Sequence, residues 1–275
     1  MTNLPLISII IPSFNQGEFI EKCLESIVAQ TFVNYEVIIQ DNNSTDNTKS
    51  ILQKYKKLKN FYIYFEKDKG QADAINKGIK KCRGQWLTWQ NCDDYYVSNM
   101  VFEKLNKEIL LDEKKKYGLF YGNIKLVNQK NYHEKELRYY GANSYTLILE
   151  GMVLTNQSCF WSRELNDKYG YLKNFKVNFD YEWFLRISQF IKFKKISYEK
   201  PLAAFVLYDE QKSNNYTKYD LELRKKIIKI YLKKFNIPNN NLVLKLLKSI
   251  SKFYRFTKLI VSGDLLYLLK KIFKT

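Results

Sequence analysis

The sequence contains few of the side chains on which many catalytic and metal sites depend. It has one histidine, His133, and four scattered cysteines, none of them in a CxxC pair. A structural zinc site is therefore not expected, and the cysteines fit a reducing compartment better than a disulfide-bonded secreted scaffold. Since His133 lies in a polar stretch, 131–135, we do not expect it to serve a Ser-His-Asp or Cys-His mechanism.

Long apolar segments are also missing. No run of about 18 apolar residues occurs, so no transmembrane helix is expected, and residues 1–6 lack the pattern of a signal peptide. The absence of GxGxxG and GxxxxGK(S/T) excludes the usual glycine-rich cradles for dinucleotides and nucleotide phosphates. With 275 residues, 45% of them hydrophobic, the chain can nevertheless form a sizeable core.

The order of the apolar patterns predicts the fold class. Strands are predicted at 6–11, 35–40, 61–65 and 85–90, and helices at 20–28, 44–55, 71–82 and 97–111. This alternation predicts an α/β fold with a doubly wound, mostly parallel sheet and helices on both faces. After Gly118, shorter strands of mixed direction are predicted at 119–121, 124–127, 159–161, 193–198 and 202–207, with a helix near 181–190.

The C-terminal fifth of the chain carries most of the excess charge. The net charge is +18, and residues 221–275 hold 14 Lys/Arg against 2 Asp/Glu. We therefore divide the chain into a domain of residues 1–215 and a basic helical extension of residues 216–275.

Within the extension, apolar and basic side chains separate around a helix. The apolar arc comprises Leu242, Val243, Leu246, Leu247, Ile250, Phe253, Tyr254 and Ile260, and the basic side comprises Lys245, Lys248, Lys252, Arg255 and Lys258. Such helices bind anionic membrane surfaces, and this is the partner that we expect. A helix packed on the preceding domain is the alternative. Nucleic acid is not expected, because no recognition motif accompanies the charge.

Two adjacent carboxylates, Asp93 and Asp94, follow the strand at 85–90 directly. Like charges side by side repel, and a hard divalent cation would remove that cost. A turn or a helix N-cap is the alternative, because aspartate favours both.

Each of the four predicted strands ends in a polar loop. These loops are residues 12–15, 41–46, 68–78 and 91–94. In a parallel sheet all four lie at the carboxyl edge, which is where such sheets bind ligands. The sequence therefore predicts one shared polar cleft.

In order and spacing, these four segments resemble the successive motifs of family 2 glycosyltransferases with the GT-A fold, over about residues 5–215. The resemblance implies an inverting enzyme that uses a nucleotide-diphosphate sugar and Mn²⁺ or Mg²⁺. It implies that Asp41 hydrogen-bonds the base, commonly uracil, and that Asp73 lies near the ribose or the sugar diphosphate. Asp93 and Asp94 match the metal-binding motif, with Asp94 the expected direct ligand. The loop implied to line the nucleoside pocket consists of Pro12, Ser13, Phe14 and Asn15.

The later segment 179–186 resembles the stretch that carries the catalytic base of this family. Asp180 takes that position, and we favour it over Glu182; an N-cap role for Asp180 is the alternative. Inversion by a single displacement needs only one base, unlike the two carboxylates of glycosidases. Where family members often carry a histidine that contacts the diphosphate or the metal, this chain has Tyr208. Lys212 is a second candidate for that diphosphate or metal contact.

We therefore expect an inverting, metal-dependent glycosyltransferase of the hexosyltransferase type. It would move a sugar from a nucleotide-diphosphate donor, expected to be a UDP-sugar, to a glycan or lipid-linked saccharide in cell-envelope polysaccharide biosynthesis. The expected place is the cytoplasm, peripheral on the inner face of the plasma membrane. A sugar-phosphate nucleotidyltransferase and a non-catalytic module that binds anionic surfaces are the alternatives.

Overall fold

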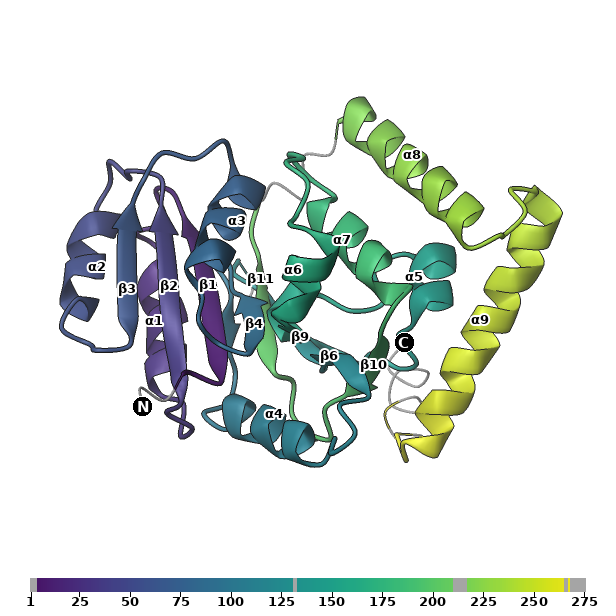
Figure 1. Ribbon diagram of the computed structural model, residues 1–275, viewed down its shortest axis with the longest axis horizontal. Coiled ribbons are helices and arrows are strands. Elements are labelled where there is room, and N and C mark those ends of the chain that lie inside the picture. Colours follow the sequence, from purple (N-terminus) through teal and green to yellow (C-terminus); the bar gives the residue numbers. More distant parts are fainter. Residues whose placement is uncertain (1–3, 131–132, 210–216, 265–266, 268–275) are drawn as a thin grey trace.

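The computed structural model describes residues 4–130, 133–209, 217–264 and 267, and its centre is a large mixed sheet (Figure 1). The strand order across this sheet is β10-β6-β9-β4-β1-β2-β3. Pairing is parallel from β4 through β1 and β2 to β3, whereas β9 runs antiparallel to β4 and β6. The strands are β1 (Ile7–Ser13), β2 (Tyr35–Asp41), β3 (Phe61–Phe65), β4 (Trp86–Trp89), β6 (Tyr117–Tyr121), β9 (Cys159–Ser162) and β10 (Lys192–Lys195).

Helices cover both faces of this sheet, which confirms the doubly wound arrangement. In β1, Ile9 and Ile11 pack on one face with α1 (Ile20–Val28), α2 (Thr48–Tyr55) and α4 (Val101–Leu110). Ile10 points the other way, because side chains alternate along a strand. The helices on its face are α3 (Gln71–Lys81), α5 (Ser144–Glu150), α6 (Glu164–Tyr169) and α7 (Phe179–Ser188).

The register of the parallel strands brings their carboxyl ends to one edge. Ser13 pairs with Asp41, and Asp41 pairs with Phe65. On the other side of β1, Ile10 pairs with Trp89 at the end of β4. The predicted juxtaposition of the four polar loops follows from this register.

A smaller sheet connects the second half of the chain to that edge. Its order is β5-β11-β7-β8. Because β11 pairs with β5, directly after Asp94, the end of β11 returns to the acidic pair. The strands are β5 (Tyr95–Tyr96), β7 (Ile124–Asn128), β8 (Glu134–Leu137) and β11 (Ala203–Leu207). The sequence did not predict β5, which has two residues, or β8, which is a polar edge strand.

The second helix begins later than its capping pattern predicts. It starts at Thr48 instead of residue 44. The Ser44 N–H donates to Asp41 at 2.7 Å, and Asp46 accepts from the N–H of Gly17 at 2.9 Å. These polar residues therefore join the strand-end loops together and do not extend the helix.

Two C-terminal helices, α8 (Lys218–Lys234) and α9 (Asn241–Val261), follow the domain (Figure 1). The predicted boundary at residue 215 and the candidate Lys212 lie outside the described residues. The helical pattern places Arg255 on the solvated basic side of the helix. The structure differs, because the Arg255 guanidinium binds Glu150 of α5 at 2.8 Å. The predicted apolar arc is divided as well, since Leu247 packs inward on the domain.

The outward face of α9 is apolar. Leu242, Leu246 and Phe253 are 78%, 62% and 68% exposed. Ile250 and Ile260 continue this outward face, and Lys245, Lys248 and Lys252 are exposed next to it. Among the residues that the structure describes, no helix is both long enough and apolar enough to span a bilayer.

Candidate active site

A cleft of about 760 Å³ opens at the carboxyl edge of β1–β4. All four strand-end loops contribute to it, as the sequence predicts. Residues from the second half of the chain close it from other sides. The lining residues include Pro12, Ser13, Phe14, Asn42, Gly70, Gln71, Asn91, Asp93, Asn156, Gln157, Asn178, Asp180 and Tyr208.

The two adjacent carboxylates lie in different surroundings. Asp93 lines the cleft, and the Tyr208 hydroxyl donates to its Oδ2 at 3.0 Å. Tyr208 in turn stacks on Phe19, with ring centroids 5.0 Å apart.

Asp94 is fully buried next to Asp93. Its Oδ2 accepts from Gln157 Nε2 at 2.7 Å and from Asn91 Nδ2 at 3.0 Å, and its Oδ1 accepts from the Val206 N–H at 3.1 Å. Burial, and then the charge of Asp93, raise the pKa of Asp94 well above its usual range, while these donors oppose the shift.

These carboxylates fit a hard divalent cation. Within the described ranges, no group of three or more His, Cys, Asp or Glu side chains could hold a metal ion. Mg²⁺-type cations, however, take one or two carboxylates and complete their shell with substrate phosphates and water. A cation would also offset the like charges that raise the pKa of Asp94. Direct ligation by Asp94 stays a prediction, and Asp93 is the carboxylate that lines the cleft.

Asp41, the expected contact for the base, is completely buried. It accepts from Ser13 Oγ at 2.8 Å, from Ser44 Oγ at 2.6 Å and from the Ser44 N–H. The carboxylate thus joins the loops after β1 and β2, and the neighbouring Asn42 lines the cleft. A contact between Asp41 and a base stays a prediction.

The other nucleotide-binding candidates are divided between the cleft and its supporting loops. Pro12, Ser13 and Phe14 line the cleft. Asn15 is not among the lining residues, and its Oδ1 accepts from the Thr45 N–H at 2.8 Å. Asp73 is not a lining residue either; it accepts from the Lys69 N–H at 2.9 Å, which holds the loop that precedes α3.

Asp180 lines the cleft from the first turn of α7. Its Oδ1 accepts from the Tyr181 N–H at 2.8 Å. Burial raises the pKa of Asp180, and the Tyr181 hydrogen bond and the Arg224 charge partly offset this effect. A carboxylate with a raised pKa is suited to accept a proton near neutral pH.

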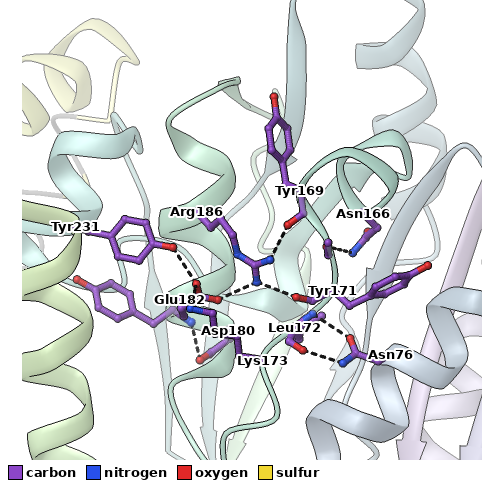
Figure 2. A network of polar contacts seen from close by, with 12 residues as sticks. Asn76, Asn166, Tyr169, Tyr171, Leu172, Lys173, Asp180, Glu182, Arg186 and Tyr231 are labelled. Carbon is purple, nitrogen blue, oxygen red and sulfur yellow. Dashed lines mark hydrogen bonds and ion pairs between the residues drawn. The ribbon is translucent and has the colours of Figure 1, made fainter. Parts of the chain in front are cut away.

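Glu182, the competing candidate, belongs to a buried network (Figure 2). It accepts from Arg186 at 2.8 Å, from Lys173 at 3.0 Å and from the Tyr231 hydroxyl at 2.8 Å. Arg186 also donates to the carbonyls of Tyr169 and Tyr171. Glu182 is occupied in this way and is not among the residues that line the cleft, whereas Asp180 is. The role of Asp180 as the base stays a prediction.

Several polar residues of the cleft are not predicted by the sequence patterns. Asn156 and Gln157 lie in η1 (Asn156–Ser158), and Asn178 precedes α7 in the left-handed conformation with φ +63°. No periodic pattern marks them. The only local signal is the polar run Thr155–Ser158 directly before a strand.

Comparison with protein-family models matches residues 8–181 to the family described as "Glycosyl transferase family 2". The chain is 29% identical to chondroitin synthase of Escherichia coli over 84% of its own length and 34% of that protein. It is 28% identical to "UDP-Glc:alpha-D-GlcNAc-diphosphoundecaprenol beta-1,3-glucosyltransferase WfgD" of Escherichia coli, over 63% of this chain and 71% of that protein. It thus spans about a third of the length of the chondroitin synthase.

Solved structures show the same fold. TarS of S. aureus in complex with UDP-GlcNAc superposes with a TM-score of 0.65 and 17% identity, over 88% of this chain and 70% of that chain. The mannosyltransferase PcManGT of Pyrobaculum calidifontis, in complex with GDP-Man and Mn²⁺, gives a TM-score of 0.55 and 13% identity, over 100% of this chain and 89% of that chain. These likenesses confirm the expected GT-A fold.

Proposed function

The chain belongs to glycosyl transferase family 2, and from this membership we propose that it transfers a hexosyl group from a UDP-sugar with inversion. The observation that carries the proposal is the cleft at the ends of β1–β4, which Asp93 and Asp180 both line. The names of the related proteins support the donor, since TarS was solved with UDP-GlcNAc and WfgD is named for UDP-Glc.

The candidate aspartates of the site divide the chemistry between them. Asp180 accepts the proton of the attacking acceptor hydroxyl, which one base can do in a single displacement. Asp93 and Asp94 would hold Mn²⁺ or Mg²⁺, which would supply Lewis-acid stabilisation of the departing diphosphate. The Mn²⁺ complex of the mannosyltransferase neighbour supports this cofactor.

The acceptor is a glycan or a lipid-linked saccharide of the cell envelope. Support comes from WfgD, whose name specifies an acceptor on diphosphoundecaprenol, and from the chondroitin synthase. A lipid-linked acceptor places the reaction at a membrane surface.

The outward face of α9 is the surface proposed to meet that membrane, on the cytoplasmic side. Exposed leucine and phenylalanine side chains next to a row of lysines match the acyl boundary and anionic headgroups of such a surface. The charge selects a membrane instead of another apolar protein surface, because buried lysines would have to lose their hydration there.

Calorimetry with UDP and hydrolysis of UDP-glucose and UDP-GlcNAc test the catalytic proposal. We expect UDP binding to require Mn²⁺ or Mg²⁺, and Asp93→Asn to weaken it by at least about tenfold, because a charged ligand is lost. Asp180→Asn should retain UDP binding and lower turnover by about 10²–10⁴-fold. Asp167→Asn, the same change at an exposed site on α6, is the matched control.

Two outcomes would contradict this proposal. Full turnover in both Asp93→Asn and Asp180→Asn would show that the cleft is not the site of transfer. Release of pyrophosphate from UTP and a sugar 1-phosphate, without transfer from a UDP-sugar, would indicate a nucleotidyltransferase.

A further inference from the structure

Two buried amide side chains of the cleft have atoms without a hydrogen-bond partner in the described part of the chain. Asn156 and Gln157 are 7% and 3% exposed, and both line the cleft. Asn156 Nδ2 and Gln157 Oε1 have no partner. A buried polar atom without a partner is costly, so a ligand in the cleft that satisfied both atoms would bind favourably.

The orientation of Gln157 is set by the acidic pair. Its Nε2 donates to Asp94 at 2.7 Å, so Oε1 is the amide atom that has no hydrogen-bond partner in the described part of the chain. The subsite therefore offers one acceptor, Gln157 Oε1, and one donor, Asn156 Nδ2.

This pair of atoms excludes the diphosphate of a nucleotide-diphosphate sugar and fits its hydroxyl-bearing parts. A fully ionised diphosphate only accepts hydrogen bonds, so it cannot satisfy Gln157 Oε1. A hydroxyl group both donates and accepts, so sugar hydroxyls satisfy both amides. Apolar side chains of Met152, Phe179 and Phe205 line the same cleft and suit the C–H surface of a sugar ring.

We propose that Asn156 and Gln157 bind hydroxyl groups of the sugar that the donor carries. This inference rests on the proposed function. It places the sugar beside the acidic pair, because Gln157 contacts Asp94 directly and the sugar is attached to the diphosphate that the pair would bind through its cation. Asn156 and Gln157 are then residues that determine donor specificity.

Calorimetry that compares UDP with UDP-glucose and UDP-GlcNAc, all with Mn²⁺, separates the sugar from the nucleotide. Asn156→Ala leaves the hydrogen bonds of Asp94 in place, so UDP affinity should stay within about twofold of wild type. The affinity for the preferred UDP-sugar should fall by about tenfold, the effect of one lost hydrogen bond. Gln157→Met should weaken the UDP-sugar more than UDP. Gln53→Ala, an exposed amide on α2, is the control and should change neither.

The proposal is overturned if Asn156→Ala weakens UDP and the UDP-sugar equally, or if it leaves both unchanged while the melting temperature confirms folding. An unchanged donor affinity with a raised KM for the acceptor would assign the subsite to the acceptor and also overturn it. If the wild-type chain binds neither UDP nor a UDP-sugar, the proposed function itself fails, and this result is distinct from the three outcomes above.

Discussion

At the residue scale, four of the five aspartates singled out by the sequence fall into two groups. Asp93 and Asp180 line the cleft, where their oxygens can meet a ligand. Asp41 and Asp94 are fully buried, and each accepts three hydrogen bonds from the protein. An aspartate of the second group stabilises the loops that shape the cleft, because it satisfies several donors at once.

The raised pKa of Asp180 leads to a prediction about pH. A base must be unprotonated, so turnover should fall as the pH is lowered and Asp180 becomes protonated. Because its pKa is raised, this loss should begin at a higher pH than for an ordinary aspartate, whose pKa is about 3.9. The folded state binds this proton more tightly than the unfolded state does. Asp180 therefore costs stability above its raised pKa, and the cost disappears as pH falls through that value.

Two measurements check this prediction. The profile of kcat/KM against pH should show an acid limb that Asp167→Asn leaves unchanged. Thermal unfolding of Asp180→Asn should show a higher melting temperature than wild type at neutral pH, with a smaller difference in acid. A melting temperature below that of wild type at neutral pH would contradict the argument from burial.

At the scale of elements, the Glu182 network holds three parts of the chain together (Figure 2). Arg186 joins Glu182 of α7 to the backbone of residues 169–171, and Tyr231 extends the network to α8. Next to it, Asn76 of α3 exchanges two hydrogen bonds with the backbone of Leu172. The helix α7, whose first turn carries Asp180, is thereby attached to the end of α6 and to α8.

Removal of Arg186 should therefore destabilise the whole domain. Arg186→Met leaves the nearly inaccessible Glu182 carboxylate with fewer donors, and losing one member of a buried pair costs about 3–5 kcal/mol. Denaturant unfolding should show this loss of free energy of unfolding. Lys225→Met, which breaks the exposed pair with Glu222 on α8, should leave unfolding unchanged. Equal effects of the two substitutions would contradict a stabilising role for the network.

At the scale of the whole molecule, α9 lies on the side of the domain away from β1–β3 (Figure 1). Its exposed apolar side chains form the outward face. Ion pairs hold its opposite face, since Arg255 binds Glu150 and Arg138 binds Asp264 just beyond the helix. The domain thus satisfies part of the positive charge, while the lysines next to the outward face remain exposed.

Vesicle binding tests the role of this face. The double variant Leu246→Ser and Phe253→Ser should lower association with vesicles that contain anionic lipid by at least about tenfold, because each side chain contributes about 1.5–3 kcal/mol when buried. Leu110→Ser with Leu111→Ser, at exposed positions next to the end of α4, is the matched control. Added salt should weaken binding of the wild type, because the lysines attract the headgroups.

Equal binding by the two double variants would remove the membrane proposal. A wild-type dimer that dissociates in the α9 variant, with no vesicle binding, would assign the face to a second copy of the chain.

Local sequence patterns were sufficient to predict the alternation of strands and helices and the edge at which the polar loops meet. Those features depend on local periodicity and on the rule that parallel strands end together, so β1–β4 and α3 lie close to their predicted positions. Short or polar elements such as β8, α5 and α6 carry too few residues for a periodic signal.

Which side chains face the cleft depends on contacts that exist only in the folded chain. Asp93 and Asp94 are neighbours with the same chemistry, and what separates them is donors 63 and 112 residues further along the chain, Gln157 and Val206. The outward face of α9 was decided in the same way, because Glu150 binds Arg255 across 105 positions. Orientation depends on partners brought together by folding, and no local pattern contains those partners.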